Sequence, residues 1–249
     1  MASTLQRQQG FGGAPRTAAA SGWLETAIWG TATALTVLGT LIALALLRQR
    51  DGSNPWARLN VYTVGFMMAG AVAGVSGAAT FLRSALRSTS GVGEALGLDY
   101  DAGIILFAVA LEPGKLAVIL DYGRWHLMPG LEQPVLQTIG LACAVAGSAG
   151  LIWADRRLAR HFASEEAAAR LMTDGPYRFV RHPRYASFLL LALGFPLVFA
   201  SVLGWPLWLL YLVMILRRIE REEPHLRALF GNAYDAYAGR TARLLPGVY

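Results

Sequence analysis

Charged residues are scarce in this chain of 249 residues, at 15% of the sequence, whereas hydrophobic residues make up 55%. A soluble domain carries about 25% charged residues, so this low fraction excludes an ordinary soluble globular protein. The apolar residues also fall in long blocks rather than in a 3.6-residue periodic pattern, which is typical of helices surrounded by lipid. The composition therefore predicts an integral membrane protein.

Cysteine and lysine are almost absent. The single cysteine, Cys143, excludes an intrachain disulfide, and with only four scattered histidines beside it no metal site is predicted. Lys115 is the only lysine, so arginine supplies nearly all of the positive charge behind the formal net charge of +6. The arginines stand between and after the apolar blocks and form no nucleic-acid recognition motif, so nucleic acid is excluded as a partner.

Four apolar spans are predicted, at residues 23–47, 59–82, 102–120 and 135–153. The third is interrupted by Glu112-Pro113-Gly114-Lys115, which either crosses the membrane or re-enters it. Glu112 and Lys115 could form a buried ion pair or lie near a substrate. Gly70 and Gly74, in the second span, have the spacing that allows close helix packing, within the chain or in a dimer. The oligomeric state stays open.

A last apolar stretch covers residues 185–216, and as one helix it would be about 48 Å long, well beyond a hydrocarbon core of about 30 Å. Gly194, Pro196, Gly204 and Pro206 punctuate it, so a helical hairpin is predicted. The hairpin places the seven arginines of residues 155–184 and the six of the tail on one face. The positive-inside rule makes that face cytoplasmic.

The predicted fold is therefore an all-α, multi-pass integral membrane protein. Residues 1–22 form a disordered N-terminal tail, and residues 23–154 form a region of four transmembrane helices. Residues 155–249 form a C-terminal region that holds the membrane hairpin and a cytoplasmic binding segment.

Three polar motifs surround the hairpin. Residues 175–185 read GPYRFVRHPRY, residues 217–223 read RRIEREE, and residues 230–237 read FGNAYDAY. Any one of them could be an interfacial anchor. Together and in this order they resemble the isoprenylcysteine carboxyl methyltransferases and their relatives among the phospholipid methyltransferases, over about residues 155–249.

The resemblance implies an S-adenosylmethionine-dependent methyltransferase that acts on a lipophilic acceptor, such as a prenylcysteine-type carboxylate. Two other hypotheses remain. One is an NADPH-dependent membrane reductase of the sterol reductase type, and the other is a non-catalytic membrane protein that keeps the scaffold.

The resemblance also implies the site residues. Arg218 falls on the substrate-side arginine, which could hold an acceptor carboxylate by a two-pronged contact. Glu222 shares its helix face and can neutralise a cationic group of the cofactor, while His182 could meet the cofactor's carboxylate. Pro224 is expected to end this helix near Glu222, which leaves Glu223 outside the site. The implied cofactor-binding positions are Tyr177, His182, Pro183, Arg184, Tyr185 and Glu222, with Ala169, Arg170, Leu171 and Met172 aligned by spacing alone.

Overall fold

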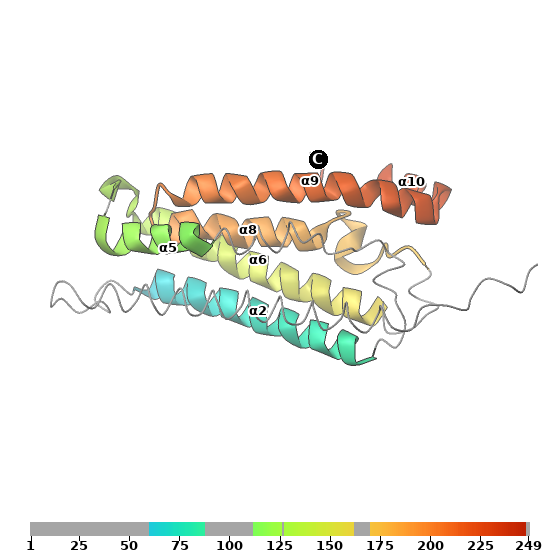
Figure 1. Cartoon of the computed structure of the whole chain (residues 1–249), viewed down its shortest axis with the longest axis horizontal. Coiled ribbons are helices and arrows are strands. Elements are labelled where there is room, and N and C mark those ends of the chain that lie inside the picture. Colours follow the sequence, from blue (N-terminus) through green and yellow to red (C-terminus); the bar gives the residue numbers. More distant parts are fainter. Residues whose placement is uncertain (1–59, 88–111, 126, 162–169, 248–249) are drawn as a thin grey trace, which may run out of the picture.

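The structure is a computed structural model that describes residues 60–87, 112–125, 127–161 and 170–247 (Figure 1). Within these ranges the chain is all-helical, as predicted, apart from one isolated bridge between Val180 and Ala242. The α-helices are α2 (Val61–Arg87), α5 (Glu112–Leu120), α6 (Pro134–His161), α8 (Pro183–Val198), α9 (Gly204–Phe230) and α10 (Asn232–Ala238).

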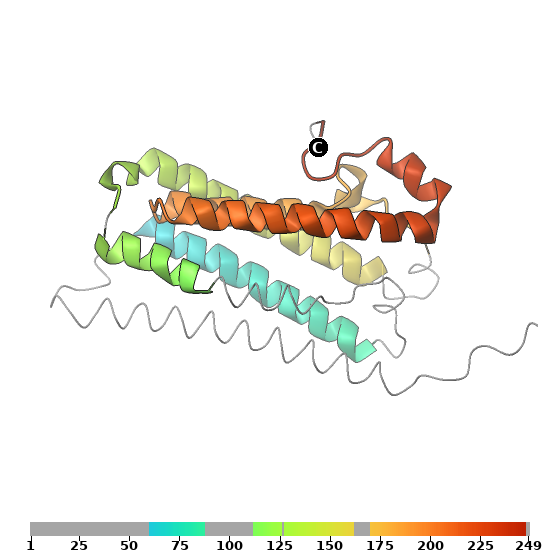
Figure 2. The ribbon, with the colours of Figure 1, turned by 45° about the horizontal axis from the view of Figure 1, so that its top comes forward.

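The four long helices lie side by side along the longest axis of the molecule (Figures 1 and 2). α6 packs against both α2 and α8, and α8 packs in turn against α9. α8 runs antiparallel to α6 and α9, so its first turn lies at the same end of the bundle as α10, while the turn between α8 and α9 lies at the opposite end.

Glycines allow α6 and α8 to approach closely. A Cβ atom added to Gly194 of α8 would lie 2.6 Å from the carbonyl oxygen of Gly140, and one added to Gly147 of α6 would lie 2.6 Å from that of Ser187. Only a hydrogen atom fits at these positions, so the two backbones meet directly. The predicted pair Gly70 and Gly74 is different, since no described atom lies within 4 Å of a Cβ added to either.

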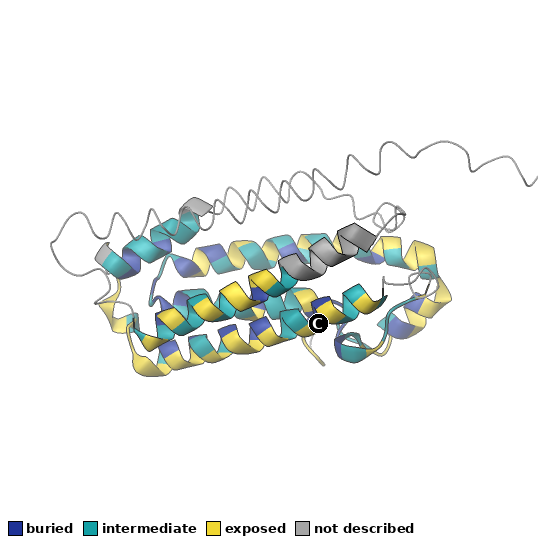
Figure 3. Cartoon of the chain, turned by 90° about the horizontal axis from the view of Figure 1, so that it is seen from below, coloured by how far each residue is buried: buried dark blue, intermediate teal, exposed yellow. Residues whose placement is uncertain are grey.

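One helix in the described ranges, α6, is long and apolar enough to cross a membrane. Residues 61–77 of α2 and residues 183–198 of α8 form shorter apolar helices. Large apolar side chains such as Val72, Val75 and Val145 are exposed on α2 and α6, and exposed positions run along the helices in Figure 3. This distribution fits a lipid environment, in which apolar surface need not be buried.

The predicted spans at 59–82 and 135–153 are helices in the structure, but both are longer than predicted. α2 continues to Arg87, and α6 continues to His161, past the predicted boundary of the C-terminal region at residue 154. The predicted span at 23–47 lies outside the described residues. Of the span at 102–120 only residues 112–120 are described, and they form α5.

The predicted helical hairpin is present, with residues 199–203 joining α8 to α9, while its place in the membrane stays a prediction. The turn is fixed by a buried contact, because the Ser201 hydroxyl donates a hydrogen bond of 2.5 Å to Oδ2 of Asp121. Gly204 begins α9 where it crosses Pro196, and an added Cβ there would lie 2.7 Å from the Cβ of Pro196.

The expected break of the second arm at Pro224 is wrong. α9 continues through Pro224 to Phe230 and keeps Glu223 in helical conformation. Proline inside a helix removes one backbone hydrogen bond and costs about 3 kcal/mol. At this point the neighbouring Glu223 forms ion pairs with Arg181 and Arg243, which tie α9 to two other segments of the chain.

Candidate functional site

The first turn of α8 faces the middle of α9, and four of the predicted site residues meet there, namely Tyr185, Arg218, Glu222 and His182, which directly precedes α8. The Tyr185 hydroxyl donates to Oε1 of Glu222 at 2.5 Å, and Nε of Arg218 donates to the same oxygen at 2.6 Å. Nε of Arg218 also donates to the Tyr185 hydroxyl oxygen. Arg218 and Glu222 share one face of α9 because they are four residues apart. The structure thus brings together three of the predicted site residues, Tyr185, Arg218 and Glu222, and their roles in binding stay predictions.

The His182 ring lies between two carboxylates. Its Nδ1 is 3.8 Å from Oε2 of Glu222, and its Nε2 is 3.6 Å from Oε1 of Glu223. Both distances exceed those of a hydrogen bond, and Nε2 has no hydrogen-bond partner in the described structure although the side chain is only 6% exposed. The Tyr185 ring stacks on the imidazole, with centroids 5.7 Å apart and an interplanar angle of 15°. Nε2 thus faces Glu223, and Nδ1 is the ring nitrogen on the side of Glu222.

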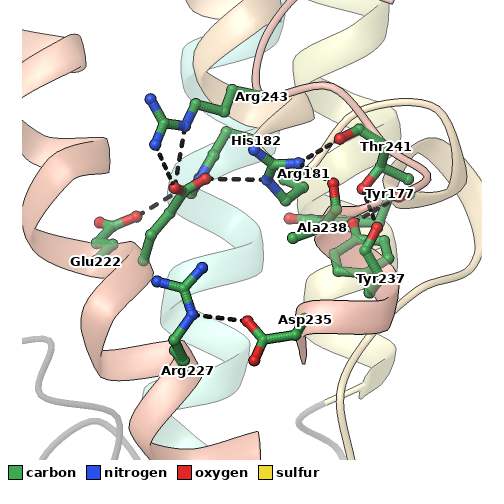
Figure 4. Close-up of polar contacts among 11 residues, drawn as sticks. Tyr177, Arg181, His182, Glu222, Arg227, Asp235, Tyr237, Ala238, Thr241 and Arg243 are labelled. Atoms are coloured by element: carbon green, nitrogen blue, oxygen red, sulfur yellow. Dashed lines mark hydrogen bonds and ion pairs between the residues drawn. The ribbon is translucent and has the colours of Figure 1, made fainter. Parts of the chain in front are cut away.

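Glu223 is the most densely paired carboxylate of the site, and we call Glu223, Arg181 and Arg243 the Glu223 cluster. Nε of Arg181 donates to Oε1 at 2.9 Å, and Nε of Arg243 donates to Oε2 at 3.0 Å (Figure 4). Burial opposes the charged form of Glu223. Interactions with His182, Arg243 and Arg181 outweigh burial and lower the pKa of the carboxyl to about 2. Glu223 is therefore ionised at neutral pH.

The segment before α8 pairs with the chain after α10. Val180 and Ala242 form a parallel bridge, the Arg181 N–H donates to the Ala242 carbonyl at 2.8 Å, and the His182 N–H donates to the Arg243 carbonyl at 3.0 Å. This short pairing fixes the backbone of His182 against residues 242–243. The imidazole position thus depends on two segments that are about 60 residues apart in the chain.

Tyr177 lies at the edge of this cluster. Its carbonyl accepts a hydrogen bond of 2.6 Å from the Tyr237 hydroxyl (Figure 4). Burial raises the pKa of the Tyr177 phenol, so the phenol is neutral at neutral pH. Nε of Arg184 is 2.9 Å from Oδ1 of Asp155, so Arg184 contacts α6.

An apolar cavity of about 200 Å³ lies beside the first turn of α8. Pro183, the first residue of α8, lines it, and Ser187 contributes the one side-chain hydroxyl. Phe179 stands at its rim, half exposed, with the Arg178 guanidinium 4.4 Å from the ring centroid. The cavity is smaller than the about 300–1,000 Å³ of pockets that hold a whole drug-sized ligand. It is lined by Gly150, Trp153, Pro176, Phe179, Val180, Pro183, Ala186, Ser187, Leu244 and Pro246.

Some predicted positions are not tied to this cluster. Arg170 is exposed, and its carbonyl oxygen lies 2.9 Å from Nε2 of His161 at the end of α6. A pocket role for Arg170, Leu171 and Met172 stays a prediction, and Ala169 lies outside the described residues.

Three residues of the site were missed. Arg181 lies inside the motif of residues 175–185, directly before His182, and could have been found by its place in that motif. Glu223 was set aside because of Pro224. Arg243 carries no signal in the sequence, because its contact depends on the fold of the chain after α10.

Comparison with known proteins agrees with the motif resemblance. Residues 135–233 match the phospholipid methyltransferase family. The protein-S-isoprenylcysteine O-methyltransferase of Schizosaccharomyces pombe is 35% identical over 77 residues, which are 30% of this chain and 33% of the relative. A probable protein-S-isoprenylcysteine O-methyltransferase of Oryza sativa subsp. indica is 37% identical over 78 residues, 31% of this chain and 41% of the relative.

A longer match joins this chain to protein-S-isoprenylcysteine O-methyltransferase B of Arabidopsis thaliana. It is 28% identical over 144 residues, which are 53% of this chain and 72% of the relative. The matches to the yeast and rice proteins span well under two thirds of those relatives' length. No solved structure matches this chain. The matched residues 135–233 contain α6, the hairpin, His182 and Glu222, so the similarity to the phospholipid methyltransferase family covers these parts of the site.

Proposed function

We propose that this chain is a multi-pass integral membrane methyltransferase that uses S-adenosylmethionine and methylates a lipophilic acceptor, with its pocket on the cytoplasmic side. The observation that carries the proposal is the convergence of His182, Tyr185, Arg218 and Glu222 at the first turn of α8. The match of residues 135–233 to the phospholipid methyltransferase family supports it.

The hydrogen-bond donors and acceptors of the site fit the charged amino-acid moiety of S-adenosylmethionine. Oε1 of Glu222 is engaged by Arg218 and Tyr185, while Oε2 lies on the side of His182. That carboxylate would hold the ammonium group of S-adenosylmethionine, and the His182 ring, whose Nδ1 lies on the side of Glu222, would meet a polar atom of the same ligand. When bound, the ligand supplies an electrophilic methyl group on its sulfonium.

The protein's task is then alignment and exclusion of water. Arg218 is 22% exposed, anchored on both Glu222 and Tyr185, and so has a fixed orientation from which its guanidinium can hold an acceptor carboxylate. A carboxylate is already a nucleophile, so no general base is required. Alignment alone can contribute several kcal/mol to a transfer between two bound groups.

The apolar cavity supports a lipophilic acceptor. It lies next to the first turn of α8, beside α6, the helix that is long enough to cross a membrane. It presents no charged side chain, so it suits an apolar chain rather than the charged part of the cofactor. We infer that part of the acceptor's apolar chain occupies it.

Isothermal titration calorimetry on the purified protein in detergent tests this proposal. We expect binding of S-adenosylmethionine and of S-adenosylhomocysteine, and much weaker binding of NADPH. Methyl transfer to a prenylcysteine should follow in lipid vesicles. Binding of NADPH without either adenosyl ligand would overturn the proposal in favour of a reductase.

A further inference from the structure

Adjacent glutamates on α9 serve different partners. Glu222 is bound by Tyr185 and Arg218, whereas Glu223 is bound by Arg181 and Arg243. Consecutive residues of a helix point about 100° apart, so the two carboxylates leave α9 in different directions. Glu222 is 22% exposed and Glu223 8% exposed. Glu222 is therefore the one that a ligand can reach, and Glu223 is enclosed.

The Glu223 cluster joins three separate segments. Arg181 belongs to the segment before α8, Glu223 to α9, and Arg243 to the chain after α10. The Arg181 guanidinium also donates to the carbonyls of Ala238, at 2.8 Å, and of Thr241 (Figure 4). One carboxylate thus fixes two guanidiniums, and one of these holds the backbone at the end of α10.

We propose that Glu223 is a positioning residue of the cofactor pocket, which through Arg181 and Arg243 holds residues 238–243 against His182 and so fixes the imidazole. This inference rests on the proposed function, in which His182 contacts the cofactor. Its physical basis is that the His182 N–H is bonded to the Arg243 carbonyl while Glu223 holds the Arg243 side chain. Loss of the Glu223 charge would leave two guanidiniums without their shared counter-ion, and the Arg181 side chain is only 12% exposed.

Three glutamine variants of neighbouring glutamates test the inference, namely Glu223→Gln, Glu222→Gln and the control Glu220→Gln. Glu220 is exposed and its contact with Arg217 is 3.9 Å long, so its variant should change nothing. The first measurement is hydrogen exchange of the Arg181 and His182 amides, which pair with residues 242–243. The second is the affinity for S-adenosylhomocysteine by calorimetry.

We expect Glu223→Gln to speed the hydrogen exchange of both amides and to weaken the affinity for S-adenosylhomocysteine about tenfold. Glu222→Gln should weaken the affinity for S-adenosylhomocysteine by about as much or more, while both amides exchange at the wild-type rate. Arg243→Gln removes one arm of the cluster at a side chain that is 33% exposed, and it should reproduce the Glu223→Gln pattern even if that variant folds poorly. The double variant should then be little worse than either single one, as residues that act together are not additive.

Weaker ligand binding by Glu223→Gln with unchanged exchange would overturn the inference, because Glu223 would then act on the His182 ring or on the ligand directly and not through residues 238–243. Unchanged ligand binding by both Glu223→Gln and Arg243→Gln would overturn it as well. If the wild-type protein binds no adenosyl ligand, the proposed function fails, whereas the exchange rates still decide whether Glu223 holds residues 238–243 in place.

Discussion

At the scale of single residues, the site is a set of paired charges in which each carboxylate has its own arginine partners. Tyr185, Arg218 and Glu222 could be predicted because they stand in quoted motifs at helical spacing. The role of Glu223 could not, because the helix continues through Pro224 against the rule that residues before proline avoid helical geometry, and the two ion pairs of Glu223 come from distant segments. Such pairs depend on the fold and leave no local pattern.

The low pKa of Glu223 predicts a dependence of stability on pH. Its pKa falls from the ordinary value of 4.5 to about 2 in the folded protein. As the pH falls, the Glu223 carboxyl is therefore protonated in the unfolded chain before it is protonated in the folded protein. The contribution to the free energy of unfolding, about 3 kcal/mol, is complete above about pH 4.5 and is lost as the pH falls toward 2.

Thermal unfolding in detergent between about pH 5 and pH 2 measures this contribution. We expect the unfolding midpoint of the wild type to fall more steeply than that of Glu223→Gln, which has no carboxyl to protonate. Parallel curves for the two proteins would contradict the low pKa.

Arg218→Lys tests the orientation of the acceptor. Lysine keeps the positive charge but loses the planar fork that contacts Glu222 and Tyr185 together and could also hold a carboxylate. We expect turnover to fall about a hundredfold, with a smaller change in cofactor affinity, since misalignment reduces rate while the donor stays bound. Arg217→Lys, one residue away and exposed, is the control. Turnover near that of the wild type in Arg218→Lys would point to an acceptor without a carboxylate.

At the scale of elements, the close contact between α6 and α8 defines the bundle. Glycines of both helices allow this contact, because they let the two backbones approach each other directly. The sequence could predict both helices from their apolar length and the hairpin from its glycines and prolines. It did not show which glycines lie at a helix contact, because Gly70 and Gly74 have the same motif spacing that close packing uses. Contact depends on which face each helix turns to its neighbour, and a block that is apolar on all sides carries no such signal.

Gly194→Ala should therefore destabilise the protein, and Gly74→Ala should not. The added methyl of Gly194→Ala meets the Gly140 carbonyl at 2.6 Å, and such overpacking costs about 1–3 kcal/mol. Gly74→Ala meets no described atom within 4 Å and gains about 0.5–1 kcal/mol of helix propensity. The midpoints of thermal unfolding in detergent should move in opposite directions. A loss of stability in Gly74→Ala would show that this face of α2 is packed.

At the scale of the whole molecule, the long helices separate two ends. The loop with Gly130 precedes α6, and the polar site lies at the other end, with Gly239 after α10 (Figure 1). If α6 crosses the bilayer, these two glycines lie on opposite sides of it. The arginines near the site predict that Gly239 lies on the cytoplasmic side.

Single cysteines at these positions in a Cys143→Ala background test the topology in vesicles of known orientation. Neither glycine has a neighbour in the described structure closer than 3.5 Å to an added Cβ, so both substitutions should be tolerated. A membrane-impermeant maleimide should label Gly239→Cys from the cytoplasmic face and Gly130→Cys from the opposite face. Labelling of both from one face would exclude a spanning α6.

The continuity of α9 restricts how the length of this protein can change during evolution. One end of the helix packs Leu207 into the buried cluster around Val198, and 15 residues later the same helix presents Glu222 to the site. Insertion or deletion of one residue between them would rotate everything beyond it by about 100° and move it by about 1.5 Å along the axis. Glu222 would then leave Tyr185, and Glu223 would leave both of its arginines. Lineages of this protein should therefore diverge by substitution between residues 207 and 223, and changes in length should accumulate in other parts of the chain.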